Sequence, residues 1–292
     1  MKGILKRTRA VALAGLLFGG GCAPRPAPVA APPQAPAPSC RAIAGLDPLL
    51  ASGTVLLLGE MHGTVESPAF VSNAACLALR AGHPVTVALE IPREEQARVD
   101  AFLASSGNGT DRAALLASPF WRAEYQDGRR SQAMLSMLDE LRHLQRAGGR
   151  LRVRLVDRMA APAVPADRDR WMAEALAQAF DEAPEHVLIA LMGNLHVRVS
   201  RGTPWDPNYE PAGFVLVSRR SDLRLTSLDV SYQGGTAWVC TSPDAASCAA
   251  RTVRGRADAQ AGRVVLNPQV TNGYHGVYDV GTLTASPPAQ AP

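Results

Sequence analysis

Apolar and polar residues follow one another along the chain in a pattern that predicts strands and helices in alternation. Strand-length runs rich in apolar residues, typical of buried strands, lie at residues 54–58, 85–89, 151–156 and 187–192. Helical spacings of apolar residues lie between and after them, at about 66–80, 93–104, 130–147 and 168–182. Alternating strands and helices favour parallel pairing through right-handed crossovers. The pattern therefore predicts an α/β fold with a mainly parallel central sheet flanked by helices.

The pattern changes after residue 205. Residues 213–218 and 223–230 are predicted as strands, and the rest of the chain is divided into short, Gly-rich segments of β character. We therefore expect a small C-terminal β-rich extension of the sheet rather than an independent domain.

The two ends of the chain differ in composition from the rest. Residues 1–21 join a basic start to a short apolar stretch and three glycines, which is the layout of an export signal rather than a membrane span. Residues 23–38 consist mostly of Pro and Ala, which favours an extended tether. The expected organisation is an export signal at 1–21, a lipidated cysteine with its tether at 22–39, one α/β domain at 40–284 and a disordered tail at 285–292.

Cys22 is the expected site of lipidation. The residues before it, Leu17 to Gly21, resemble a bacterial lipobox, in which the cysteine is acylated and becomes the new N-terminus. We expect lipid chains there to hold the protein in the bacterial cell envelope, facing the periplasm or at the outer membrane. The alternative is an ordinary secreted protein with a free cysteine near its N-terminus.

Four further cysteines follow Cys22, an even number that is typical of an oxidising compartment. Cys240 and Cys248 flank a short polar loop, so a local disulfide is expected between them. Cys40 and Cys76 would then join the start of the domain to the first predicted helix. The alternative for Cys76, which lies in the apolar run AACLAL, is a buried thiol. No cysteine pair has the spacing of a zinc site.

The charge distribution argues against a nucleic-acid partner. The formal net charge is +4, but four of the 30 Lys and Arg residues lie before Cys22, where no Asp or Glu occurs. From Cys22 onward, 26 basic residues are balanced by 26 acidic ones, and every one of the basic residues is arginine. Without lysine, this part of the chain cannot form a lysine Schiff base or a P-loop phosphate site. The expected partners are a small-molecule substrate or ligand and, through the lipid, a membrane.

Ionisable or polar residues follow each of the four predicted buried strands. In chain order they are Glu60, His62, Glu90, Asp157, Asn194 and His196. Because the carboxyl ends of parallel strands share one edge of a sheet, these side chains are expected to converge on one site. The alternative for Asp157 is a structural salt bridge to Arg158 or Arg168.

This set of side chains fits the hydrolysis of an ester or amide bond. A histidine paired with a carboxylate, such as His62 with Glu60 or Glu90, can deprotonate water. His196 would act as the partner acid or hold a ligand oxygen. Substrate binding is expected from arginines that stabilise developing negative charge and from polar neighbours, namely Arg129, Arg130, Arg168, Asn194 and Asp157. The same histidines and glutamates (His62, His196, Glu60 and Glu90) are also ligand types for a divalent metal, so metal-assisted and metal-free water activation both remain open.

Four segments of the chain carry a resemblance to known proteins: LLLGEMHGTVESPAF, ALEIP, RDRWMAEAL and LMGNLHVR. They resemble the superfamily of ChaN-like haem-uptake lipoproteins, Tiki/TraB proteins and erythromycin esterases, over roughly residues 54–205. The stretch from Arg168 to Ala173 looks most like the ChaN branch, whereas Gly63 and Thr64 look like the erythromycin-esterase branch. Resemblance to the ChaN branch implies haem contact through a tyrosine, for which Tyr125 is the candidate.

Two functions follow as hypotheses. The first is an envelope-anchored hydrolase of ester or amide bonds, of the erythromycin-esterase or Tiki type. The alternative is a non-enzymatic uptake lipoprotein that binds haem or iron. The GxSxG and HExxH motifs are absent from the sequence, as is a phosphate-binding glycine loop after a strand. A site rich in carboxylates is less suited to a flat apolar macrocycle than to hydrolysis, which favours the first hypothesis.

Overall fold

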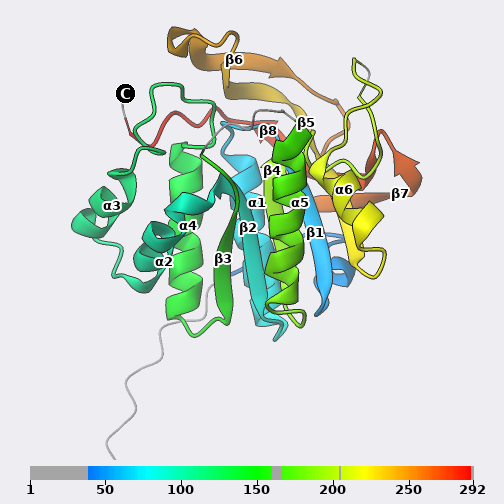
Figure 1. Cartoon of the computed structure of the whole chain (residues 1–292), viewed down its shortest axis with the longest axis horizontal. Coiled ribbons are helices and arrows are strands. Elements are labelled where there is room, and N and C mark those ends of the chain that lie inside the picture. The colour runs from blue at the N-terminus through cyan, green and yellow to red at the C-terminus, as the bar shows by residue number, and fades with distance from the viewer. Residues whose placement is uncertain (1–38, 160–165, 204, 291–292) are drawn as a thin grey trace, which may run out of the picture. The chain divides into compact units, whose positions relative to one another are not determined.

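The strands form one sheet in the computed structural model of the chain, which describes residues 39–159, 166–203 and 205–290 (Figure 1). They are β1 (Thr54–Glu60), β2 (Val85–Pro92), β3 (Leu151–Asp157), β4 (Val187–Gly193), β5 (Arg224–Cys240), β6 (Cys248–Arg254), β7 (Arg263–Thr271) and β8 (Tyr274–Leu283). Their order is β3-β2-β4-β1-β5-β8-β7, and β6 pairs with β5. All pairings along this order from β3 to β8 are parallel. β7 pairs antiparallel with β8, and β6 pairs antiparallel with β5. These findings confirm the predicted fold class, including the C-terminal β-rich extension.

Helices cover both faces of the parallel part of this sheet. They are α1 (Glu66–Arg80), α2 (Gln96–Ala104), α3 (Gly109–Leu116), α4 (Gln132–Arg146), α5 (Ala166–Asp181) and α6 (Ala212–Arg219), with short 3-10 turns at Asp47–Leu49, Arg93–Glu95 and Ala245–Ser247. Helices α1, α2 and α4 pack on one face and α5 and α6 on the other (Figure 1). Among the described residues, no helix is long and apolar enough to cross a membrane.

The central strand β1 contributes to two hydrophobic cores, because successive side chains of a strand point to opposite faces. Leu56 and Leu58 pack in the core beneath α1, α2 and α4, whereas Val55 and Leu57 pack in the core beneath α5 and α6. All four side chains are buried. A strand that is covered on both faces has no polar face, which explains the continuous apolar run seen in the sequence.

Residues 213–218 form part of helix α6, so the strand predicted there is wrong. The buried positions in this segment fall at Ala212, Gly213, Val215 and Leu216. This three-to-four residue spacing is helical and not the alternation of a strand. Gly213 allows close packing, because a Cβ atom there would lie 2.6 Å from the Val197 carbonyl oxygen. Pro211 precedes the helix at its N-cap, where a missing N–H costs little.

Helix α3 was not predicted from the sequence. Asn108 caps it by accepting hydrogen bonds from the backbone of Thr110 and Asp111, and the Asp111 side chain accepts from the Asn108 backbone in return. Only Leu115 of this helix is buried, so the apolar pattern that reveals amphipathic helices is weak here.

Residues 285–290 are ordered by hydrogen bonds, so the disordered tail predicted for 285–292 is wrong for this part. Ser286 is buried; its backbone N–H donates to Gly63 O, and its Oγ accepts from Ala133 N. Farther along, the Pro287 carbonyl accepts from Gln132 N at the start of α4. The segment therefore supplies acceptors for N–H groups that the first turn of a helix leaves free.

Two disulfides join the four described cysteines as predicted. Cys40 is bonded to Cys76 of α1, and Cys240 is bonded to Cys248 across the loop between β5 and β6. The predicted export signal, the lipidation of Cys22 and the tether up to residue 38 lie outside the described residues, and they remain predictions.

Candidate functional site

The carboxyl ends of β1, β2, β3 and β4 bring together the side chains that the sequence placed there. Glu60 and Asp157 are the last residues of β1 and β3, Glu90 lies near the end of β2, and the turn after β4 carries His196. Glu60, Glu90 and Asp157 are each 3–4% exposed, so their charges are removed from water and need partners inside the protein. The arrangement follows directly from the parallel order of these strands.

His62 lies between two carboxylates. Its Nδ1 is 2.9 Å from Glu60 Oε1, and its Nε2 is 3.5 Å from Glu90 Oε2. Burial alone would lower the pKa of His62, but the charges of Glu90 and Glu60 outweigh it and raise the pKa to about 10. His62 is therefore an imidazolium at neutral pH, with both ring nitrogens donating. The role of a resting general base, expected from the sequence, does not agree with this protonation state.

The turn that carries His62 depends on a glycine. Gly63 has a φ of 75°, and a Cβ atom there would lie 2.2 Å from the Trp238 carbonyl oxygen of β5. The backbone oxygen of Gly63 accepts hydrogen bonds from Trp238 N at 2.9 Å and Ser286 N at 2.8 Å. The turn is thereby fixed to β5 on one side and to the C-terminal segment on the other.

Glu90 is the most connected acidic group of the site. Its Oε2 accepts a hydrogen bond from Gly193 N at 2.6 Å, and its Oε1 accepts from Arg168 Nη2 at 2.5 Å. Burial would raise the pKa of Glu90, but the positive charges of His62 and Arg129 hold it well below its usual value. Glu90 therefore remains a carboxylate, and it is a weak base. Its contacts orient His62 and do not favour a role in taking a proton from water.

Arg129 and Arg168 lie behind Glu90 and share Asp157. Arg168 donates to both Asp157 oxygens, at 3.1 and 2.7 Å, while Arg129 Nη1 donates to Asp157 Oδ2 at 2.8 Å. Arg129 also donates from Nε and Nη2 to Asp127 Oδ2. The structural salt bridge considered for Asp157 with Arg168 is present. Arg129, Arg168 and Asp157 are therefore paired with charged side chains of the protein. They are not free groups that face a substrate, as the sequence led us to expect.

His196 is fixed by partners on both ring nitrogens. Arg168 Nη1 lies 3.0 Å from its Nε2, and Asp169 Oδ1 lies 2.7 Å from its Nδ1. Because a guanidinium only donates, Nε2 is the acceptor, and the proton of the neutral ring is on Nδ1 and directed to Asp169. The hydroxyl of Tyr209 donates to Asp169 Oδ2 at 3.0 Å, and Ala212 N donates to Asp169 Oδ1 at 2.8 Å. His196 is thus held in one orientation.

A cavity of about 340 Å³, here called the His62 cavity, lies in front of these groups. Its lining is Glu60, Met61, His62, Tyr125, Asp127, Gly193, Asn194, Leu195, His196, Val239 and Cys240. Asn194 and the candidate Tyr125 therefore share a space with both histidines. Arg130 does not line it; its Nη1 donates to the Tyr125 carbonyl at 2.7 Å, and its guanidinium lies over the Phe120 ring.

The metal site considered for His62, His196, Glu60 and Glu90 does not agree with their arrangement. A metal ligand needs a free nitrogen lone pair, and the ring nitrogens of both histidines are occupied by carboxylates or by Arg168. In the part of the chain that the structure describes, no three His, Cys, Asp or Glu side chains form a group that could hold a metal ion.

Several residues of the site were not found from the sequence. Asp169 and Tyr209, which orient His196, lie in a helix and in a loop, where no strand-end rule applies. Asp229 of β5 could have been predicted by that rule, because it lies opposite Gly59 near the end of β1. Its Oδ1 is buried without a hydrogen-bond partner among the described residues. Burial raises the pKa of Asp229 to about 6.

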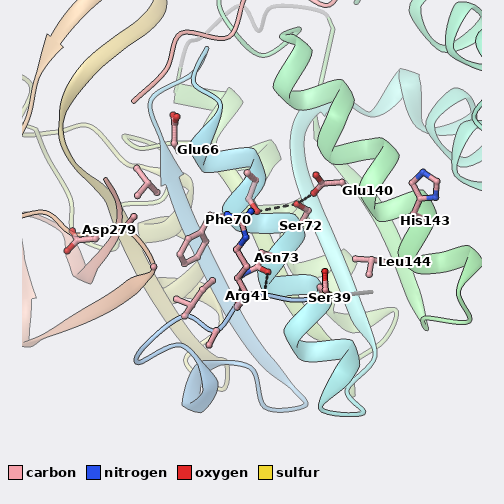
Figure 2. Close-up of a pocket in the computed structure, with 17 residues that line it drawn as sticks. Ser39, Arg41, Glu66, Phe70, Ser72, Asn73, Glu140, His143, Leu144 and Asp279 are labelled. Carbon is pink, nitrogen blue, oxygen red and sulfur yellow. Dashed lines mark hydrogen bonds between the residues drawn. The ribbon is translucent and has the colours of Figure 1, made fainter. Parts of the chain in front are cut away.

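A larger cavity lies elsewhere in the described part of the chain. It measures about 780 Å³ and is lined by residues of α1, α4, β8 and the segment around Arg41 (Figure 2). Of its lining, Ser72 is hydrogen-bonded to Glu140 and Asn73 to the Arg41 backbone. None of the residues predicted for the functional site lines it, so cavity size does not identify the site here.

Comparison with known proteins shows a shared fold. No protein-family model matches the chain, and its sequence matches no curated protein. A mutant erythromycin esterase, solved in its open conformation, is 11% identical with a TM-score of 0.57, over 82% of this chain and 93% of the esterase. A succinoglycan biosynthesis protein is 9% identical with a TM-score of 0.56, over 82% of this chain and 91% of its own. The chain therefore has an erythromycin-esterase-like fold.

Proposed function

We propose that this protein is a hydrolase of ester or amide bonds whose centre is Glu60, His62, Glu90 and His196. The observation that carries the proposal is the His62 imidazole, held between two buried carboxylates at the wall of a cavity. Buried groups with strongly shifted pKa values in a cavity are typical of catalytic sites. The fold shared with an erythromycin esterase agrees with this class of reaction.

In the proposed mechanism, the substrate carbonyl occupies the His62 cavity. Glu60 lines that cavity, so its carboxylate is placed to accept a proton from the attacking water. The His62 imidazolium then donates its proton to the leaving oxygen or nitrogen, and Glu90 fixes the orientation of the ring. Asn194 lines the same cavity; its side-chain amide also hydrogen-bonds Asp229, and we propose that its remaining N–H donates to the developing oxyanion. His196 is a positioning residue, because it acts on Glu90 through Arg168.

Rates with chromogenic esters and anilides test the proposal. We expect His62→Asn, Glu60→Gln and Glu90→Gln to lower kcat/KM by about 100-fold or more. His143→Asn and Glu185→Gln change exposed side chains of the same types and should leave the rate unchanged. The proposal is wrong if His62→Asn and Glu90→Gln keep the wild-type rate on every substrate that the protein hydrolyses.

Haem uptake is the second candidate, and it depends on Tyr125. This side chain is 38% exposed and lines the His62 cavity, whereas neither histidine has a free ring nitrogen for iron. Titration with haemin should give a saturable Soret shift that is lost in Tyr125→Phe if the protein binds haem. A linear absorbance increase without saturation would exclude this function.

We further propose that the protein is anchored in the bacterial envelope by lipid on Cys22. The two disulfides support an oxidising compartment such as the periplasm. Cys22→Ser should move the protein from the membrane fraction to the soluble fraction, while an exposed change such as Ser218→Ala should not. Retention of Cys22→Ser in the membrane fraction would contradict the anchor.

A further inference from the structure

A second cavity lies next to the proposed catalytic groups and has a different chemical character. It measures about 270 Å³, and its charged lining consists of Arg129, Arg130, Arg158, Arg168 and Asp157. Phe120, Pro92 and Met159 contribute apolar wall. We call it the arginine cavity. Counting Glu90 and Asp127, which contact these arginines from outside the lining, four guanidinium groups face three carboxylates, and the remaining positive charge attracts anions.

Glu90 connects the arginine cavity to the His62 cavity. Its Oε2 faces His62, which lines the first cavity, and its Oε1 is hydrogen-bonded to Arg168, which lines the second. The Glu90 carboxylate therefore lies between His62, which we propose protonates the leaving group, and Arg168 of the arginine cavity.

Arg130 is a partly buried cation of this cavity that lacks full compensation, whereas Arg158 is exposed. Arg168 forms ion pairs with Glu90 and Asp157. Arg129 forms ion pairs with Asp127 and Asp157 and has a longer contact of 3.5 Å with Glu90. Arg130 reaches only Asp127, at 3.3 Å, and it shares that carboxylate with Arg129. Its Nε is buried without a hydrogen-bond partner among the described residues. Burial accordingly lowers the pKa of Arg130, because the nearby negative charge does not offset it.

We propose that the arginine cavity binds an anionic group of the substrate, a carboxylate or a phosphate. Arginine forms paired, charge-assisted hydrogen bonds with both groups. The enzyme would then prefer esters or amides that carry negative charge close to the bond that is cleaved. This specificity rests on the proposed hydrolase function, but the binding of an anion in the cavity does not.

Calorimetric titration of the full chain with inorganic phosphate and, separately, with glutarate tests the binding alone. We expect at least one of the two anions to bind, and Arg130→Gln to raise its Kd about tenfold or more. Arg158→Gln, a change at an exposed position of the same cavity, should also weaken binding. Arg122→Gln changes a nearby exposed arginine outside the cavity and is the matched control. Binding of only one anion identifies the preferred group.

Hydrolysis of p-nitrophenyl acetate and of mono-p-nitrophenyl glutarate tests the specificity. We expect Arg130→Gln to lower kcat/KM for the charged ester about tenfold more than for the neutral ester. The inference is overturned if neither anion binds the wild-type protein, or if both Arg130→Gln and Arg158→Gln bind anions as tightly as Arg122→Gln. Anion binding without hydrolysis of any substrate would instead contradict the proposed function and leave the cavity assignment standing.

Discussion

The His62 imidazolium and the carboxylates of Glu60 and Glu90 stabilise one another's charge. Neither His62 nor Glu90 would keep its charge as readily if it were buried alone, because burial disfavours the ionised form. The folded protein therefore holds His62 protonated at a pH where the unfolded chain does not. Such a difference in proton affinity makes the stability depend on pH.

We expect the stabilisation from this group to be largest between about pH 4.5 and 6.5, the ordinary pKa values of Glu and His. The raised pKa of His62 contributes stability that is complete below 6.5 and is lost as the pH rises through about 10. The lowered pKa of Glu90 contributes stability above 4.5 that is lost as the pH falls. Urea unfolding of wild type and His62→Asn measures this: their difference in unfolding free energy should shrink between pH 6 and 10. A constant difference would contradict the assignment.

Asp229 should have the opposite effect on stability. Its pKa is raised to about 6 from 3.8, so the folded state binds its proton more tightly and loses stability as the pH rises between these values. Asp229→Asn should therefore raise the free energy of unfolding by about 1–3 kcal/mol at pH 8 and change it little at pH 3.5. Asp47→Asn, at an exposed position, is the control. Destabilisation by Asp229→Asn at pH 8 would contradict this expectation.

At the residue scale, the strand-end rule found the side chains of the site but not their protonation. Glu60, His62 and Glu90 were predicted together because parallel strands end at one edge. The charge of His62 depends on distances of a few ångströms, which no spacing in the sequence encodes. The partners Asp169 and Tyr209 could not be predicted, because a helix and a loop bring them to His196 only in the folded chain.

At the scale of elements, α4 begins against the C-terminal segment. Its residues Gln132 and Ala133 donate backbone hydrogen bonds to Pro287 O and Ser286 Oγ, and Ser131 Oγ accepts from Met134 N. N–H groups in the first turn of a helix have no partner within the helix. Ser286 and Pro287 therefore complete the first turn of a helix that begins more than a hundred residues earlier in the chain.

Ser286→Ala should lower the free energy of unfolding by about 1–3 kcal/mol, because the buried Ala133 N–H loses its acceptor. Thermal or urea unfolding measures the change. Ser218→Ala, which removes an exposed hydroxyl from α6, should change the stability by less than about 0.5 kcal/mol. Equal stability of the two variants would show that the hydrogen bond to Ser286 is not important.

Predictions of single elements failed where packing outweighs local pattern. Residues 213–218 contain a continuous apolar run that is typical of both a strand and a short buried helix, and the tertiary packing of the segment, including the close approach of Gly213 to Val197, distinguishes the two. The Ala and Pro composition of 285–290 indicates disorder, yet backbone hydrogen bonds order it. The composition of a segment does not show which other part of the chain forms hydrogen bonds with its backbone N–H and C=O groups.

For the whole molecule, the two disulfides close loops of very different length. Cys40 and Cys76 are 36 residues apart, and Cys240 and Cys248 are 8 apart. Loop entropy predicts losses of about 4 and about 2.5 kcal/mol when the first and the second pair are replaced by alanine. Urea unfolding of the two double variants measures both. A larger loss for the short loop would show that loop entropy does not determine the contribution.

The fold class of the whole molecule was predictable, but the order of its strands was not. Alternating strands and helices were sufficient for a parallel sheet with helices on both faces. Placing β1 at the centre between β4 and β5 requires knowledge of which apolar surfaces pack together, because β1 does not pair with β2, the strand that follows it in the chain. The antiparallel pairing of β6 with β5 was visible only as β-like composition.

The central place of β1 has a consequence for how fast the protein reaches its native state. Val55 pairs with Leu188 on one side and with Leu225 on the other, so both neighbours of the first strand are synthesised late. Pairings between such distant residues require the closure of long loops, and proteins rich in them fold on the scale of milliseconds to seconds. β1 can therefore be paired on both sides only after β4 and β5 have been synthesised. A chain that crosses a membrane before it folds would keep β1 without its sheet partners in transit for this reason, and the charged side chains at the strand ends would come together only after β4 has joined β1.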